Sequence, residues 1–109
     1  MTAPEVGAAE LAAGLAEGRM VAIDVRTPEE WDAAHIAGAT WIPMFELGRR
    51  MDELPRDVRL AMVCRSGSRS GAVADHLAGA GYDVVNLAGG MQAWVAAGLP
   101  VEPPGGPVL

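Results

Sequence analysis

The chain contains no lysine and a single cysteine, Cys64, and each scarcity excludes whole classes of chemistry. One cysteine cannot form an intramolecular disulfide, a Cys-x-x-Cys redox pair or a cysteine-rich zinc site. All eight basic residues are arginine, which excludes a Walker-type phosphate loop and Schiff-base catalysis on lysine. Only two histidines, His35 and His76, accompany the cysteine, so we expect no metal site and no cofactor.

Positive charge and long apolar runs are also scarce. The formal net charge of −6 argues against non-specific binding to nucleic acid. No stretch approaches the ~20 apolar residues that a membrane span needs. The N-terminus shows no basic segment followed by an apolar run, so no signal peptide is expected. The sequence predicts a cytoplasmic protein of one domain that binds neither nucleic acid nor membrane.

Short apolar runs alternate with segments of helical character. The pattern predicts strands at residues 20–25, 39–42, 60–64 and 83–87, and helices at 8–17, from 28, 45–52, 68–80 and 90–97. Strands separated by helices imply an α/β fold of three layers, with a mostly parallel central sheet and helices on both faces. In such sheets ligands bind beyond the carboxyl ends of the strands, where Cys64 lies.

Several side chains have expected structural roles. Thr27 is expected to cap the helix that begins at Pro28, with Glu30 as its capping-box partner. Arg26 and Glu30, four residues apart, are expected to form an ion pair. Ser68 or Ser70 is expected to cap the helix after Cys64. Further residues are expected to be buried in the core, namely Trp31, Trp41, Phe45, Leu47, Met51 and Trp94.

The segment from Cys64 to Ser70 carries the pattern of a reactive site. A tight turn from a strand into a helix aims several backbone N–H groups inward and forms an anion-binding nest. The helix N-terminus, Arg65 and Arg69 add positive charge, and Gly67 permits a positive φ. These features would lower the pKa of a thiol at Cys64 and make it a nucleophile without a histidine partner.

Three segments together resemble the rhodanese family of sulfurtransferases. The segment from Ile23 to Trp31, followed by His35 to Ala39, is similar to the family's N-terminal motif. Cys64 to Ser70 resembles its active-site loop, and Asn86 to Trp94 its C-terminal motif. The three motifs occur in the family's order and spacing, and the resemblance extends over nearly the whole chain.

The resemblance implies a rhodanese-like domain over residues 1–101 with five strands, followed by an irregular Pro/Gly-rich tail over 102–109. It implies a thiosulfate sulfurtransferase without cofactor, in which Cys64 takes a sulfur from a small anionic donor such as thiosulfate. The resulting persulfide would pass the sulfur to cyanide or a thiol. The substrate-binding residues implied are those of the loop, namely Arg65, Ser66, Gly67, Ser68, Arg69 and Ser70.

Two alternatives stay open at this point. The protein could be a persulfide carrier that receives sulfur from one partner protein and delivers it to another, as a member of a sulfur relay. It could also be a phosphatase or arsenate reductase of the same fold. Cysteine phosphatases use a Cys-x5-Arg loop, whereas Cys64 and Arg69 are separated by four residues. The shorter loop favours sulfur transfer. Asp24 is expected to be a structural hydrogen-bond acceptor, and His35 is expected to anchor a turn by hydrogen bonding. Whether Asp24, His35 or Met91 also contributes to the pocket is left open.

Overall fold

The computed structural model describes all 109 residues as one α/β domain built on a five-stranded parallel sheet. The strand order is β1-β5-β4-β2-β3, and every neighbouring pair is parallel. The strands are β1 (Glu5–Val6), β2 (Met20–Asp24), β3 (Thr40–Trp41), β4 (Arg59–Val63) and β5 (Val84–Leu87). The predicted fold class and the implied count of five strands are confirmed, although the apolar pattern did not reveal the two-residue β1.

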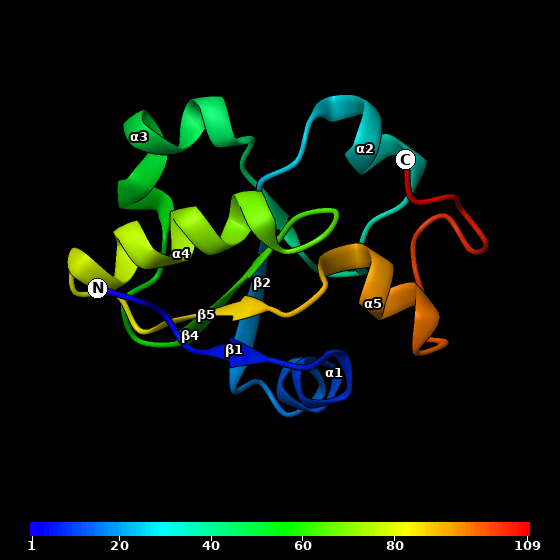
Figure 1. Cartoon of the computed structure of the whole chain (residues 1–109), viewed down its shortest axis with the longest axis horizontal. Helices are drawn as coiled ribbons and strands as arrows, with labels where there is room; N and C mark the ends of the chain where they lie inside the picture. The colour runs from blue at the N-terminus through cyan, green and yellow to red at the C-terminus, as the bar shows by residue number, and fades with distance from the viewer.

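Helices cover both faces of the sheet and form the outer two layers (Figure 1). The helices are α1 (Ala8–Ala16), α2 (Pro28–Ala33), α3 (Leu47–Arg50), α4 (Ser68–Gly79) and α5 (Gly90–Ala96), with 3-10 turns η1 (Met44–Glu46) and η2 (Met51–Glu53). One core cluster joins the sheet to α4 and α3, and a second joins it to α1 and α5. No helix is long and apolar enough to cross a membrane.

The side chains of β4 point alternately into the two core clusters, one on each face of the sheet. Leu60, Met62 and Cys64 face the cluster under α4, whereas Ala61 and Val63 face the cluster under α1 and α5. Because successive side chains of a strand point to opposite faces, the continuous apolar run of β4 is buried on both sides. Cys64 therefore ends the strand on the face that α4 covers.

The segment between β3 and β4 differs from its prediction. A single helix over residues 45–52 was expected, but the chain forms η1, α3 and η2 in succession. Leu47 is buried as predicted, whereas the Phe45 side chain is 75% exposed, so its predicted burial is wrong. Trp31 and Trp41 are only half-buried and stack on each other, while Trp94 lies in the core as expected.

The last residues pack against the body without regular structure. The backbone of Glu102 exchanges hydrogen bonds with that of His35 at 2.8 and 2.9 Å. Val101 is buried, and the segment after it forms only a bridge and a turn. These contacts hold the end of the chain beside α2 (Figure 1).

Candidate active site

Cys64 lies directly after β4, at the carboxyl edge of the sheet, and is fully buried. The chain turns at Gly67, which has a φ of 98°, and enters α4 at Ser68. Gly67 occupies the N-cap position without any side-chain cap, so the predicted capping by Ser68 or Ser70 is wrong. A left-handed turn at this point requires glycine because other residues are strained there.

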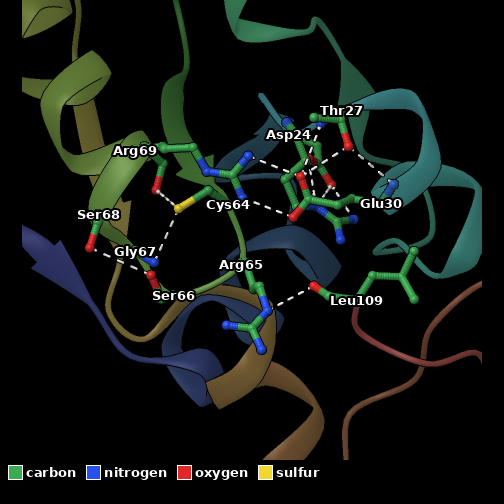
Figure 2. A network of polar contacts seen from close by, with 12 residues as sticks. Asp24, Thr27, Glu30, Cys64, Arg65, Ser66, Gly67, Ser68, Arg69 and Leu109 are labelled. Carbon is green, nitrogen blue, oxygen red and sulfur yellow. Dashed lines mark hydrogen bonds and ion pairs between the residues drawn. The ribbon is translucent and has the colours of Figure 1, made fainter.

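The sulfur of Cys64 has two hydrogen-bonding neighbours (Figure 2). The backbone N–H of Gly67 donates to Sγ at 3.1 Å, and Ser70 Oγ lies 3.3 Å from Sγ. Burial raises the pKa of the Cys64 thiol, but the Ser70 hydroxyl and the backbone N–H groups of Ser70, Gly67 and Ser66 around the sulfur outweigh it, so the pKa is lowered. The loop therefore stabilises a thiolate, as a nucleophile requires.

The N-terminus of α5 supports the loop from Cys64 to Ser70 through backbone hydrogen bonds. The Met91 N–H donates to the carbonyl of Cys64 at 2.8 Å, and the Gln92 N–H donates to the carbonyl of Arg65 at 3.0 Å. These approaches require Gly90, with a φ of 57°, because a Cβ there would overlap the Cys64 carbonyl oxygen and lie 2.7 Å from Arg65 backbone atoms. Met91 is fully buried in the core.

Replacing Gly90 with alanine is expected to displace the loop after Cys64 and to slow the sulfur transfer that the sequence predicts at least about tenfold, because backbone atoms must move to admit the methyl group. Steady-state kinetics would measure the loss. Gly98→Ala is the matched control, since Gly98 also has a positive φ, 76°, but nothing lies within 4 Å of the position that its added methyl group would take. Equal losses in both variants would show that backbone strain, not crowding at the loop, is responsible.

Arg69 on α4 forms a two-pronged ion pair with Glu30 on α2 (Figure 2). Its Nη1 and Nη2 donate to the two carboxylate oxygens at 2.9 and 2.8 Å. The predicted pair between Arg26 and Glu30 is therefore wrong. Arg26 precedes the helix, so the spacing of four does not bring it to Glu30. It instead pairs with Asp24, and both side chains are completely buried.

Glu30 joins two elements of the site. Its carboxylate also accepts hydrogen bonds from Thr27 N–H and Oγ1 at 3.2 and 3.1 Å. The Glu30 N–H in turn donates to Thr27 Oγ1 at 3.4 Å, which completes the predicted capping box. The hydrogen bonds from Arg69, opposed by burial and assisted by Thr27, lower the pKa of Glu30 from 4.5 to about 2. One carboxylate thus fixes both the start of α2 and the first turn of α4.

Glu30→Gln is expected to lower the free energy of unfolding by about 1–2 kcal/mol at neutral pH, since glutamine keeps the cap but loses the charge that Arg69 binds. A carboxyl whose pKa is lower in the folded state stabilises the fold above its unfolded pKa. That stabilisation is lost as the pH falls from 4.5 towards about 2. Urea titrations across this range should show the two proteins converging. A difference in the free energy of unfolding between the two proteins that stays constant down to the lowest pH would contradict a lowered pKa at Glu30.

The other polar loop residues point outward. Arg65 extends away from the sulfur, and its Nε donates to the backbone oxygen of Leu109 at 2.7 Å (Figure 2). Ser66 and Ser68 are exposed, with their hydroxyl oxygens 3.5 Å apart. Of the loop side chains, only that of Ser70 contacts the Cys64 sulfur. The loop otherwise offers its backbone N–H groups.

Asp24 and His35 have structural contacts. The Asp24 carboxylate accepts from the Arg26 backbone N–H and guanidinium, in agreement with its expected role as a hydrogen-bond acceptor. His35 Nδ1 lies 2.8 Å from the Trp31 carbonyl oxygen and its ring stacks on Trp31, in agreement with an anchoring role. His76 lies on α4, away from the loop, and no group of three or more potential ligands is placed to hold a metal ion.

Sequence reasoning did not identify Asn86 of β5 as part of the site. Asn86 Oδ1 accepts from Ser70 Oγ at 2.6 Å, and its Nδ2 donates to the Gly67 carbonyl at 2.9 Å and to Glu5 Oε2 at 3.2 Å. Its side chain is only 3% exposed. A polar residue inside an otherwise apolar buried strand was the available signal, because such a group needs hydrogen-bond partners.

A pocket of about 360 Å³ lies beside the loop on the side of Arg69. Its lining combines the polar start of α2 with two apolar side chains of η1, Met44 and Phe45. Both are exposed, at 40% and 75%. The loop therefore adjoins a surface that is partly apolar and carries an arginine.

Comparisons with known proteins agree with this architecture. The family model of the rhodanese-like domain matches residues 7–97. A sulfurtransferase of Allochromatium vinosum is 41% identical over 85 residues, which cover 77% of this chain and 79% of the relative. A putative sulfur carrier protein of Bacillus subtilis is 37% identical over 73 residues, covering 66% of this chain and 40% of the relative. The crystal structure of a rhodanese-related protein from Thermoplasma volcanium superposes with a TM-score of 0.85 at 34% identity, covering 90% of this chain and 96% of the other.

Proposed function

The chain belongs to the rhodanese-like domain family, and we propose on this premise that it is a sulfurtransferase that carries sulfur as a persulfide on Cys64. The observation that carries the proposal is the pair of contacts to the buried sulfur, from Gly67 N–H and Ser70 Oγ. The Gly67 N–H favours the thiolate over the thiol, and the Ser70 hydroxyl does so when it donates its proton to Sγ rather than to Asn86 Oδ1. The sulfurtransferase relative supports the reaction class.

In the first step the Cys64 thiolate attacks the outer sulfur of a donor such as thiosulfate. A bond forms between Sγ and that sulfur while the sulfur–sulfur bond of thiosulfate breaks. The bonding electron pair leaves with sulfite. The negative charge that remains on the terminal sulfur of the persulfide would be held by the N–H groups of the loop, from Arg65 to Ser70.

In the second step an acceptor such as cyanide or a thiolate attacks the terminal sulfur. The bond to Sγ breaks, its electron pair returns to Sγ, and the thiolate is restored. Because Cys64 is the only cysteine in the sequence, no second thiol of the chain can take the sulfur. The acceptor must come from outside the chain.

The two arginines would contribute differently to an anionic donor. Arg69 is paired with Glu30, so much of its charge is already compensated. Arg65 is bonded to a backbone oxygen of Leu109 and lies at the exposed side of the loop. We expect Arg65 to attract the donor, while Ser66, Gly67, Ser68, Arg69 and Ser70 bind mainly through their backbone.

The test is the formation of thiocyanate from thiosulfate and cyanide, measured over a matrix of both concentrations. A persulfide intermediate predicts parallel double-reciprocal lines, since sulfite departs before cyanide reacts. Intersecting lines would require both substrates to be bound together and would contradict the intermediate. Absence of thiocyanate above the protein-free rate would contradict thiosulfate as a donor.

A second candidate function is that of a sulfur carrier between proteins. The exposed apolar side chains of Met44 and Phe45, next to the pocket that Arg69 lines, favour a protein partner at this edge. The carrier relative from Bacillus subtilis supports the same function. Incubation with a cysteine desulfurase and cysteine, followed by mass analysis, tests it. Loading from the desulfurase that exceeds loading from thiosulfate supports the carrier, and loading from thiosulfate alone contradicts it.

A further inference from the structure

Two groups lie within hydrogen-bonding distance of the Cys64 sulfur in a suitable direction, and both belong to residues that the Asn86 side chain binds. Gly67 donates its N–H to Sγ and offers its carbonyl to Asn86 Nδ2 at 2.9 Å. Ser70 Oγ lies 3.3 Å from Sγ and 2.6 Å from Asn86 Oδ1, so its one hydroxyl proton is donated either to the sulfur or to the amide oxygen. We propose that Asn86 is a positioning residue that fixes both hydrogen-bonding neighbours of the reactive sulfur.

The orientation of the Asn86 amide is determined by its partners. Nδ2 has two hydrogens, and it donates to the Gly67 carbonyl and to Glu5 Oε2. The oxygen must then face Ser70, where a hydroxyl can donate to it. Glu5 reaches this position because β1 pairs with β5 in the register that places Glu5 opposite Asn86.

The space around Asn86 leaves it little freedom to move. A Cβ at Gly71 would lie 3.2 Å from Nδ2, and a Cβ at Gly67 would lie 3.7 Å from it. The two glycines therefore let α4 and its preceding turn approach the amide closely. Because the amide is buried and its bonds run to three different segments, the loop cannot relax without breaking them.

The charged groups around the sulfur lie on separate elements and are mostly compensated. Arg69 on α4 is paired with Glu30 on α2, and Asp24 at the end of β2 is in its own buried ion pair. Arg65 extends away from the sulfur (Figure 2), and Glu5 on β1 reaches the site only through the amide. A substitution at Asn86 would leave these charges in place. It would therefore change the pKa of Cys64 mainly through the orientation of the neutral donors.

The proposal rests on the proposed function only in taking Cys64 as the reacting group, and its test needs no sulfur transfer. Ultraviolet absorbance of the thiolate is followed against pH in the full chain, with Cys64→Ser as the blank. A single cysteine makes the signal unambiguous. The variants are made in a Ser70→Ala background, so that removing the amide releases no hydroxyl proton to the sulfur. In that background Asn86→Leu, of similar size, should move the midpoint of the thiolate titration upward by about one pH unit, the effect of losing roughly the hydrogen bond from Gly67 N–H.

Val85→Ala is the matched control, because Val85 is the neighbouring residue of β5 and faces the opposite core. It should lose stability without moving the midpoint. Glu5→Gln, which can still accept from Asn86, should move the midpoint less than Asn86→Leu does. If the leucine variant does not fold, Asn86→Asp serves instead, since its carboxylate cannot donate to the Gly67 carbonyl and should move the midpoint upward at least as far.

An unchanged or lower midpoint in a folded Asn86 variant would overturn the positioning role, even if the protein transfers sulfur. A raised midpoint in a protein that forms no persulfide would support the positioning role while contradicting the proposed function. A midpoint that moves equally in Val85→Ala would also overturn the inference, because general loss of packing would then explain it.

Discussion

Cys64→Ser is expected to reduce thiocyanate formation by about a thousandfold or more, the size of loss seen when a covalent nucleophile is removed. The hydroxyl of serine is far less acidic than a thiol and cannot be held as an anion by the same hydrogen bonds. An oxygen at this position cannot form a persulfide. Initial rates at saturating donor and acceptor, set against the protein-free reaction, measure the effect.

The serine variant should remain folded because the substitution replaces one small buried atom by another with the same neighbours. Serine Oγ can accept from Gly67 N–H as Sγ does. A thermal melt close to that of the wild type would verify this. His76→Gln is a suitable control, since His76 lies on α4 outside the loop, and its activity should equal that of the wild type. Activity in Cys64→Ser within tenfold of the wild type would refute a persulfide on this residue.

Asp24→Ala is expected to cause the largest loss of stability, about 3–5 kcal/mol, because it leaves a buried arginine without its counter-charge. Arg26 and Asp24 are 0% and 1% exposed, and their three side-chain hydrogen bonds measure 2.8 to 3.1 Å. Arg26 Nη1 has no partner, and the guanidinium would keep only the neutral Ala34 carbonyl, which accepts from Nη2 at 2.7 Å. Small domains are stable by only ~5–15 kcal/mol, so the loss is a large part of the total.

A surface pair provides the comparison for Asp24. Asp83 pairs with Arg59 at 3.0 Å, but the two side chains are 55% and 48% exposed. Asp83→Ala should therefore cost at most ~1 kcal/mol. Urea denaturation of both variants gives the difference directly. If Asp24→Ala lowers the free energy of unfolding no more than Asp83→Ala does, the buried ion pair does not stabilise the fold as described. The double variant Asp24→Ala, Arg26→Leu should recover part of the loss, since no uncompensated charge remains.

Local patterns in the sequence were sufficient for most of the fold and for the position of Cys64 at the carboxyl edge of the sheet. The apolar runs, the capping box of Thr27 and Glu30, and the turn after Cys64 all depend on residues close together in the chain. Ser68 and Ser70 were plausible caps by residue type. The turn instead places Gly67 at the cap, which frees the Ser70 hydroxyl to lie beside the sulfur.

Partners that are distant in sequence could not be predicted in this way. Glu30 and Arg69 are 39 residues apart, and Asn86 meets Glu5 across 81 residues. Only the register of the sheet and the approach of the start of α2 to the first turn of α4 bring these side chains together. The spacing of Arg26 and Glu30 suggested a pair that the extended backbone before α2 does not allow.

The mass of the intact protein after exposure to thiosulfate tests the central claim most directly. The account predicts a species heavier by one sulfur atom, located on Cys64 by fragmentation, which disappears when cyanide or a thiol is added. The same treatment of Cys64→Ser should leave the mass unchanged. A wild-type protein that gains no sulfur from thiosulfate or from a persulfide-generating desulfurase, or that gains it elsewhere than on Cys64, would contradict the account.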